Sequence, residues 1–156
     1  MDLTVGQSAQ RTVTEAMVQT YAEITGDYNP LHFDAAFTAQ TRFGRLMGQG
    51  GITTGLLHAL VAMDMPGPGT VFTKQSFTFP RPVFIGDTIT AKATVLSVHP
   101  RRPMAKLAFS VTNQDGEEVL NGEASVFQDG PAAPEANLPS GRSTQAGNSP
   151  SGSGEG

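Results

Sequence analysis

The chain contains 156 residues, and its 38% hydrophobic content is enough for one folded core but not for two. The formal net charge is −4, from 10 Lys and Arg against 14 Asp and Glu, and the sequence has no polybasic run of the kind that binds nucleic acids. Cysteine is absent, which excludes disulfides, thiolate nucleophiles and thiolate metal sites.

The first residues, Met1-Asp2-Leu3-Thr4, lack the basic and apolar regions of a secretory signal peptide. No apolar run approaches the roughly 18 residues that a membrane-spanning helix needs. We therefore expect a cytoplasmic protein with neither a membrane partner nor a nucleic-acid partner.

Residues 2–13 are expected to form a short extended segment, and a helix follows it. Thr14 can cap the start of this helix, and Glu15 places a carboxylate in the first turn, where the helix dipole favours it. Gly26 is a natural end for the helix. Its apolar face is expected to comprise Ala16, Met17, Val18, Tyr21, Ala22 and Ile24.

Residues 27–32, Asp-Tyr-Asn-Pro-Leu-His, bring an acid and a base close together in the sequence. Pro30 disfavours helical backbone at Asn29, so Asp27 and His32 are expected in a turn or loop rather than on one helix face. There the two side chains can converge on one small molecule such as water. Asn29 is expected to stabilise this turn by a hydrogen bond from its side chain to the backbone.

After this bend, Asp34 can cap a second, short helix, and residues 26–47 are expected to form a folded flap rather than a pair of strands. Residues 50–64 then form a helix that is apolar nearly all round, so it should be buried on most sides. Gly55, Ala59 and Ala62 permit another backbone to approach it closely.

The second half alternates apolar and polar positions, which is typical of strands with one buried face. The core-facing positions are expected to be Val71, Phe77, Phe79, Ile89, Ala91, Ala93, Val95, Ala105, Leu107, Phe109, Val111, Leu120, Ala124 and Val126. Turn residues separate the runs, so we predict an antiparallel meander packed on the central helix. Leu96 and Val98 break the alternation of their strand, which predicts a bulge or a change of side there.

Residues 129–156 are expected to form a disordered tail that follows a single folded domain of residues 1–128. From Pro131 to Gly156, 14 of 26 residues are Pro, Gly or Ser, and Leu138 is the only large aliphatic residue. Such a segment cannot bury enough apolar surface to offset the entropy of ordering it.

Residues 24–34, Ile-Thr-Gly-Asp-Tyr-Asn-Pro-Leu-His-Phe-Asp, followed by Phe43-Gly44-Arg45, resemble the hydratase motif of the MaoC-like family, the (R)-specific enoyl-CoA hydratases. Residues 75–87 resemble the corresponding strand and turn of that family, and together the similarities cover most of residues 12–127. The fold expected is α+β: a single hotdog domain in which a curled antiparallel sheet wraps around a central apolar helix.

The resemblance implies reversible (R)-specific hydration of a trans-2-enoyl-CoA to a (R)-3-hydroxyacyl-CoA. In that family the aspartate and histidine of the motif hold the water, which assigns these roles to Asp27 and His32, with Asn29 and Pro30 as supporting residues. The glycine that opens the central helix donates its N–H to the thioester oxygen, and by position this is Gly50.

Four further residues are expected at the substrate: Gln49, Gly51, His58 and Arg81. Two of them depart from the family, whose members commonly have histidine in place of Gln49 and a small polar residue in place of His58. The second departure bears on the acyl pocket, and His58 is expected to be a core or pocket-lining residue, with a catalytic role as the alternative. Arg81, like Arg101, Arg102 and Lys106, is a candidate to contact the phosphates of coenzyme A, and surface cations without a ligand are the alternative.

The chemistry explains why these residue types are needed. Adding water to a 2-enoyl thioester needs a base for the water, a proton for the α-carbon and stabilisation of the enolate-like oxygen. An acid and base pair provides the first two, and free N–H groups at a helix N-terminus provide the third. No cofactor is implied, because the coenzyme A thioester is itself the substrate, and three histidines at 32, 58 and 99 without clustered acids do not form a metal site.

Two alternatives remain from the sequence. A hotdog thioesterase usually needs a carboxylate along the central helix, where this chain has only Asp64 at the far end. A non-catalytic subunit that binds acyl-CoA or acyl-carrier-protein thioesters is the other. In each case we expect a homodimer, because a single curled sheet leaves an open edge and an open groove.

Overall fold

The structure is a computed structural model that describes residues 7–130. The predicted tail from residue 131 onward lies outside the described residues. The elements in chain order are β1 (Gln7–Thr12), α1 (Glu15–Thr25), α2 (Pro30–Phe33), α3 (Ala35–Ala39), α4 (Gly50–Met63), β2 (Thr70–Thr78), β3 (Thr88–Val98), β4 (Met104–Thr112) and β5 (Glu118–Gln128). No helix in the described part of the chain is long and apolar enough to cross a membrane.

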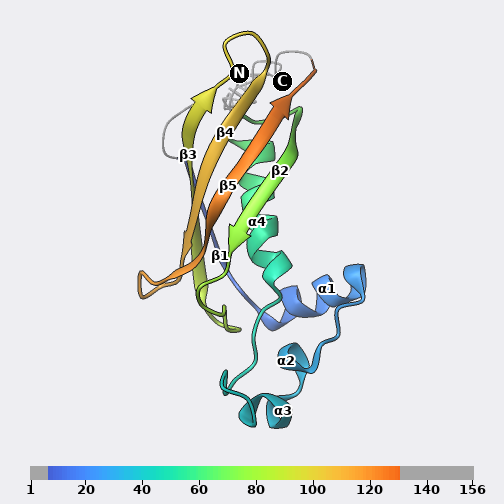
Figure 1. The fold of residues 1–156 in the computed structure, drawn as a ribbon. Coiled ribbons are helices and arrows are strands. Elements are labelled where there is room, and N and C mark those ends of the chain that lie inside the picture. Colours follow the sequence, from blue (N-terminus) through green and yellow to red (C-terminus); the bar gives the residue numbers. More distant parts are fainter. Residues whose placement is uncertain (1–6, 131–156) are drawn as a thin grey trace, which may run out of the picture.

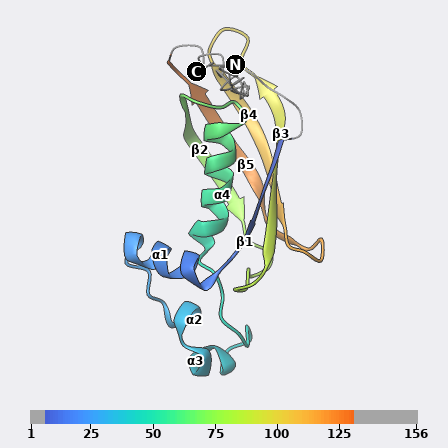
Figure 2. The ribbon, with the colours of Figure 1, turned by 180° about the vertical axis from the view of Figure 1, so that it is seen from behind.

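The strands form one antiparallel sheet of five strands in the order β1-β3-β4-β5-β2, and α4 lies along its concave face (Figure 1). Helices α1, α2 and α3 gather at the end of the sheet where α4 begins (Figure 2). The predicted curled sheet around a central apolar helix is therefore confirmed. α4 begins at Gly50, so the fold brings the N-terminus of this helix to the three shorter helices.

The core lies between α4 and the inner face of the sheet. The strand positions predicted to face it are buried in β4 and β5, and in β3 as far as Ala93. The predicted irregularity in β3 is confirmed, because the register with β4 shifts between Val95 and Ser97. From α4, the side chains that fill this core are Leu56, Leu57, Leu60 and Val61.

Two predictions about β2 were wrong. Val71 is exposed, and Phe72 packs against the core together with Phe77, because the register with β5 shifts just after Phe72. Phe79 is also exposed, and it lies beyond the end of the strand. β2 is also not part of the meander, because it pairs with β5 at one edge of the sheet while β3 pairs with β1 and β4. The segment after β2 therefore crosses from one edge to the other beneath the start of α4 (Figure 2).

α1 begins and ends as predicted. The Thr14 side chain accepts a hydrogen bond from the Met17 N–H, and Gly26 ends the helix with a left-handed φ of 79°. Of the predicted apolar face, Val18 and Ala22 are buried, whereas Ala16 and Ile24 are exposed, so only part of this face packs against the core.

α4 is buried on one side only, although the sequence predicted burial on most sides. The face that carries Gly55, Ala59 and Met63 is exposed. The edge of β2 opposite β5 has no neighbouring strand among the described residues. The chain therefore leaves one apolar helix face and one strand edge uncovered.

Candidate active site

Asp27 and His32 lie together at the junction of α1 and α2. The Asp27 Oδ2 atom is 3.7 Å from the His32 Nε2 atom. The carboxylate side chain is 42% exposed and the imidazole is 10% exposed, so solvent reaches the pair from the aspartate side. The structure thus brings together the acid and the base that the sequence singled out.

The backbone between these two residues is held by local hydrogen bonds. Asn29 is extended, with φ −53° and ψ 130°, and its side chain accepts a hydrogen bond from the Leu31 N–H at 3.1 Å. The Asp27 side chain accepts from the Asn29 N–H at 3.3 Å. Pro30 then occupies the first turn of α2, where its missing N–H costs nothing. Asp27 lies in the predicted turn and the two residues do not share a helix face, whereas His32 lies on a short helix capped by Asn29 and not in the predicted turn or loop.

The His32 ring is oriented by the backbone of Met47. Its Nδ1 atom lies 2.8 Å from the Met47 carbonyl oxygen, and since a carbonyl only accepts, Nδ1 carries the hydrogen. In the neutral ring the Nε2 atom is then an acceptor, and it faces the carboxylate of Asp27, which is also an acceptor. A water molecule has two hydrogens and satisfies both groups at once.

The two glycines that open α4 differ in what surrounds them. A Cβ atom on Gly50 would meet only the ring of Phe79, at 3.5 Å, which is ordinary contact. A Cβ atom on Gly51 would lie 1.7 Å from the Tyr21 hydroxyl oxygen. Packing therefore requires glycine at 51, because the tyrosine fills the space beside it, but packing does not require glycine at 50.

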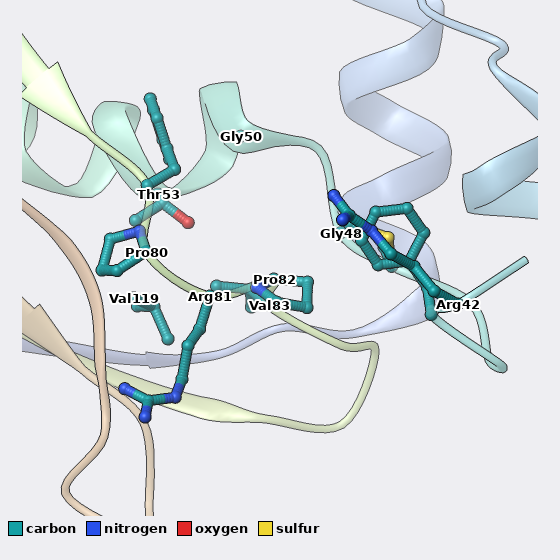
Figure 3. A pocket seen from close by; sticks show the side chains of 12 residues that line it. Arg42, Gly48, Gly50, Thr53, Pro80, Arg81, Pro82, Val83 and Val119 are labelled. Carbon is teal, nitrogen blue, oxygen red and sulfur yellow. The ribbon is translucent and has the colours of Figure 1, made fainter.

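Gly50 opens onto a cavity of about 350 Å³ between the flap, the start of α4 and the segment after β2 (Figure 3). Arg42 and Arg81 both line it, and the rest of the wall is largely apolar, with Phe43, Phe79, Pro80, Pro82, Val83 and Val119. In Figure 3 the guanidinium of Arg81 points away from Gly50. The Arg81 Nε atom lies 2.9 Å from the Glu117 carboxylate.

His32 lines a neighbouring cavity of about 430 Å³, next to Leu46 and α1. Met47 lies between the two cavities. Its carbonyl contacts His32, which lines one of them, and Met47 itself lines the cavity at Gly50. The acid–base pair and the helix N-terminus are thus separated by one short segment of backbone.

Three of the four predicted substrate residues, Gln49, Gly51 and His58, line neither of these cavities. Gln49 is 2% exposed, its Nε2 donates to the Val18 carbonyl at 3.0 Å, and its Oε1 has no hydrogen-bond partner. His58 is exposed, stacks on Phe72 with ring centroids 4.3 Å apart, and contacts Gln75 at 2.8 Å. Neither residue touches Asp27 or His32 in these contacts.

Sequence reasoning missed two parts of the site. The Met47 carbonyl is a backbone group, so its role cannot be predicted from the type of residue at that position. Tyr21 was assigned only to the apolar face of α1, and nothing in the sequence connects it with Gly51. Within residues 7–130 no group of three or more His, Asp or Glu side chains is arranged to hold a metal ion.

The chain is similar in sequence to a known protein family and to characterised enzymes. Residues 1–116 match the family described as MaoC like domain. The 3-hydroxybutyryl-CoA dehydratase of Methylorubrum extorquens is 40% identical over 127 residues, which is 80% of each chain.

Two solved structures are also similar. The (R)-hydratase from Aeromonas caviae involved in PHA biosynthesis has 36% identity and a TM-score of 0.75, and the match covers 81% of this chain and 98% of that one. An R-hydratase from Pseudomonas aeruginosa has 33% identity and a TM-score of 0.75, with 82% of each chain covered.

Proposed function

Because the chain belongs to the MaoC-like family, and is a hydro-lyase with the hotdog fold, we propose that it adds water reversibly to trans-2-enoyl-CoA to form (R)-3-hydroxyacyl-CoA. The observation that carries this proposal is the 3.7 Å approach of Asp27 and His32, with the histidine ring oriented by Met47. Two acceptors at this distance are suited to hold one water molecule beside the substrate.

In this proposal the pair removes a proton from the water as its oxygen bonds to the β-carbon. The electrons of the carbon–carbon double bond move toward the thioester, and its oxygen becomes enolate-like. The proton then returns from the pair to the α-carbon, so one water is consumed and no charge is left over. Because one pair handles both hydroxyl and proton, they arrive on the same face of the substrate. The reverse sequence dehydrates a 3-hydroxyacyl thioester.

The Gly50 N–H is proposed as the donor to the developing oxyanion. It lies at the start of a helix of 14 residues, so its N–H is free and the dipole is positive at this end. The absence of a steric need for glycine at 50 supports this role, because the space there is open to the cavity. Losing one such donor typically costs about 2.7–4 kcal/mol of barrier.

The cavity at Gly50 is proposed to receive the thioester end of the substrate. Its apolar wall suits the thiol arm of the carrier, and Arg42 supplies positive charge at its rim for phosphates. In this proposal Arg81 exchanges its ion pair with Glu117 for a phosphate of the substrate. We propose coenzyme A as this carrier, in line with the name of the Methylorubrum relative.

The thioesterase alternative receives less support. Helix α4 carries no Asp or Glu from Gly50 to Met63, and Asp64 stands at its C-terminal cap, far from the start of the helix. A hydrolase would need that carboxylate or an equivalent group near the thioester carbon.

The assay follows the absorbance of crotonyl-CoA at the band of its conjugated double bond, together with free thiol measured by a disulfide reagent. Hydration removes the band and releases no thiol. Thiol release would support a thioesterase instead, and tight binding without turnover at every chain length from about four to twelve carbons would support a non-catalytic binder.

A homodimer is also proposed. The free edge of β2 and the exposed face of α4 lie on one side of the molecule, and both are surfaces that a second copy is suited to cover (Figure 2).

A further inference from the structure

Asp87, in the turn before β3, is the only buried carboxylate among residues 7–130, with 4% of its surface exposed. Its Oδ2 atom accepts a hydrogen bond from the Phe84 N–H at 2.9 Å. Its Oδ1 atom accepts from the Gln114 side chain at 2.9 Å and lies 3.8 Å from the Arg45 guanidinium. A buried carboxylate is costly unless it is satisfied in this way.

These partners come from three separate parts of the chain. Phe84 belongs to the segment after β2, Gln114 to the loop between β4 and β5, and Arg45 to the flap. The Arg45 guanidinium also lies over the Phe84 ring, 4.1 Å from its centroid. Asp87 therefore fixes the segment after β2 against the sheet on one side and the flap on the other.

The same segment supports the residues that orient His32. The Ile85 N–H donates to the Leu46 carbonyl at 3.1 Å, and Met47 pairs with Phe84 as an isolated β-bridge. The Met47 N–H donates to the Leu31 carbonyl at 3.0 Å. Hydrogen bonds on either side of this bridge, from the Gly48 N–H to the Val83 carbonyl and from the Ile85 N–H to the Leu46 carbonyl, hold Phe84 beside Met47. Asp87 is thus linked to the ring of His32 through the backbone of Phe84 and Met47.

We propose that Asp87 is a positioning residue for the reaction, acting through Phe84 and Met47 on the orientation of the His32 ring. The expected effect of Asp87 on kcat rests on the proposed function. The effect of Asp87 on the orientation of the His32 ring does not depend on that function and can be tested separately.

Asp87→Asn tests the proposal at nearly constant volume. The Asn oxygen still accepts from the Phe84 N–H, but its NH₂ then faces the NH₂ of Gln114, so two donors oppose each other. Gln114 cannot relieve this by turning its amide, because its Oε1 already accepts from the Thr88 N–H at 3.1 Å. The variant is expected to lose about 10–100-fold in kcat with KM nearly unchanged, as expected for a misplaced catalytic group.

Asp87→Asn combined with Gln114→Glu provides the rescue. The glutamate accepts from the Asn NH₂ and from the Thr88 N–H, so both hydrogen bonds return and the negative charge stays near Arg45. The double variant is expected to regain most of the lost kcat. A double variant no more active than Asp87→Asn would overturn the proposal.

Asn113→Ala is the matched control. Asn113 accepts from the N–H groups of Asp115 and Glu117 in the same loop as Gln114, but it does not contact Asp87. It is expected to lower thermal stability and to leave kcat unchanged. An equal loss of kcat in this control would mean that any loosening of the loop suffices, and the specific role of Asp87 would be rejected.

The ¹⁵N resonances of the His32 imidazole supply a readout that does not depend on turnover. The wild-type protein is expected to show the hydrogen on Nδ1, and Asp87→Asn to show a mixture of the two tautomers. An unchanged tautomer in Asp87→Asn would contradict the coupling. An inactive wild type whose tautomer still responds to Asp87 would reject the proposed function and leave the coupling intact.

Discussion

The imidazole of His32 is held by the backbone of Met47, whose carbonyl oxygen lies 2.8 Å from Nδ1. This contact turns Nε2 toward the carboxylate of Asp27. The flap and the start of α4 meet at Met47, so the orientation of the histidine depends on the packing of both.

Removing either member of the acid–base pair is expected to abolish most of the hydratase activity. Asp27→Asn keeps the shape of the side chain but removes its charge, and His32→Ala removes the ring. General acid–base groups contribute roughly 10²–10⁴-fold, so kcat should fall by this factor in each variant. Crotonyl-CoA absorbance measures it. Variants that hydrate crotonyl-CoA at the wild-type rate would leave the pair without a catalytic role.

Loss of the Asn29 cap is expected to affect catalysis as well as stability. Asn29→Ala removes the acceptor of the Leu31 N–H, which costs about 0.5–2 kcal/mol and frees the turn that carries His32. Asp34→Ala is the matched control, because Asp34 caps α3 in the same way at 2.9 Å. Urea unfolding should show a similar decrease in the free energy of unfolding for both variants, whereas kcat should fall only for Asn29→Ala. Equal kcat in the two variants would argue against this role for Asn29.

Gly50→Ala is expected to lower activity without lowering stability. The added methyl group makes only ordinary contact with Phe79, and alanine favours a helix over glycine by up to about 1 kcal/mol. The free energy of unfolding should therefore be unchanged or higher. The methyl group nevertheless enters the space proposed for the thioester, so kcat/KM should fall by about tenfold or more. Full activity in this variant would show that the thioester oxygen does not bind at Gly50.

Gly51→Ala is expected to destabilise the protein only while Tyr21 is present. The new methyl group overlaps the tyrosine hydroxyl, which must then leave its place. In a double-mutant cycle with Tyr21→Ala, residues in direct contact couple by roughly 0.5–3 kcal/mol. Urea unfolding of the four proteins measures the coupling, and additive effects would show that the tyrosine does not constrain residue 51.

Arg42 and Arg81 are expected to act on KM rather than on kcat. Each Arg→Ala variant should raise KM for crotonyl-CoA up to about fivefold, since an exposed ion pair is worth at most about 1 kcal/mol. The N-acetylcysteamine thioester lacks the phosphates and should show no such change. Lys92→Ala removes an exposed charge from the outer face of the sheet and serves as control. An equal effect on both thioesters would rule out phosphate contact.

The proposed dimer should weaken when a charge is placed on the open face of α4. Ala59→Glu introduces a carboxylate there, whereas Thr94→Glu places one on the outer face of β3. Sedimentation equilibrium should give twice the chain mass of 16.3 kDa for wild type and Thr94→Glu, and a smaller mass for Ala59→Glu. A monomeric wild type would overturn the expectation.

Much of the local structure followed from the sequence because short-range physics decides it. Thr14 and Gly26 bound α1 as predicted, since a hydroxyl cap and a left-handed glycine act within one turn. The period-two pattern identified the buried faces of β3, β4 and β5 for the same reason. The Asp27–His32 pair was found because five residues of chain, stiffened by Pro30, keep the two side chains close.

Contacts between distant segments escaped sequence reasoning. The pairing of β2 with β5 and the shift after Phe72 depend on which strands meet, and a period-two pattern carries no information about partners. The requirement for glycine at 51 comes from Tyr21, thirty positions earlier, whereas the sequence alone predicted a place for Gly51 at the substrate.

The sequence by itself predicted which residues are candidates for acid–base chemistry and that a helix begins at Gly50. Only the tertiary structure decided which nitrogen of His32 faces Asp27, because that depends on the Met47 carbonyl, and a carbonyl exists at every residue. Met47 is held by the hydrogen bond that its N–H donates to the Leu31 carbonyl and by its bridge to Phe84. These contacts form only when the flap, the turn before β3 and the start of α4 have folded together.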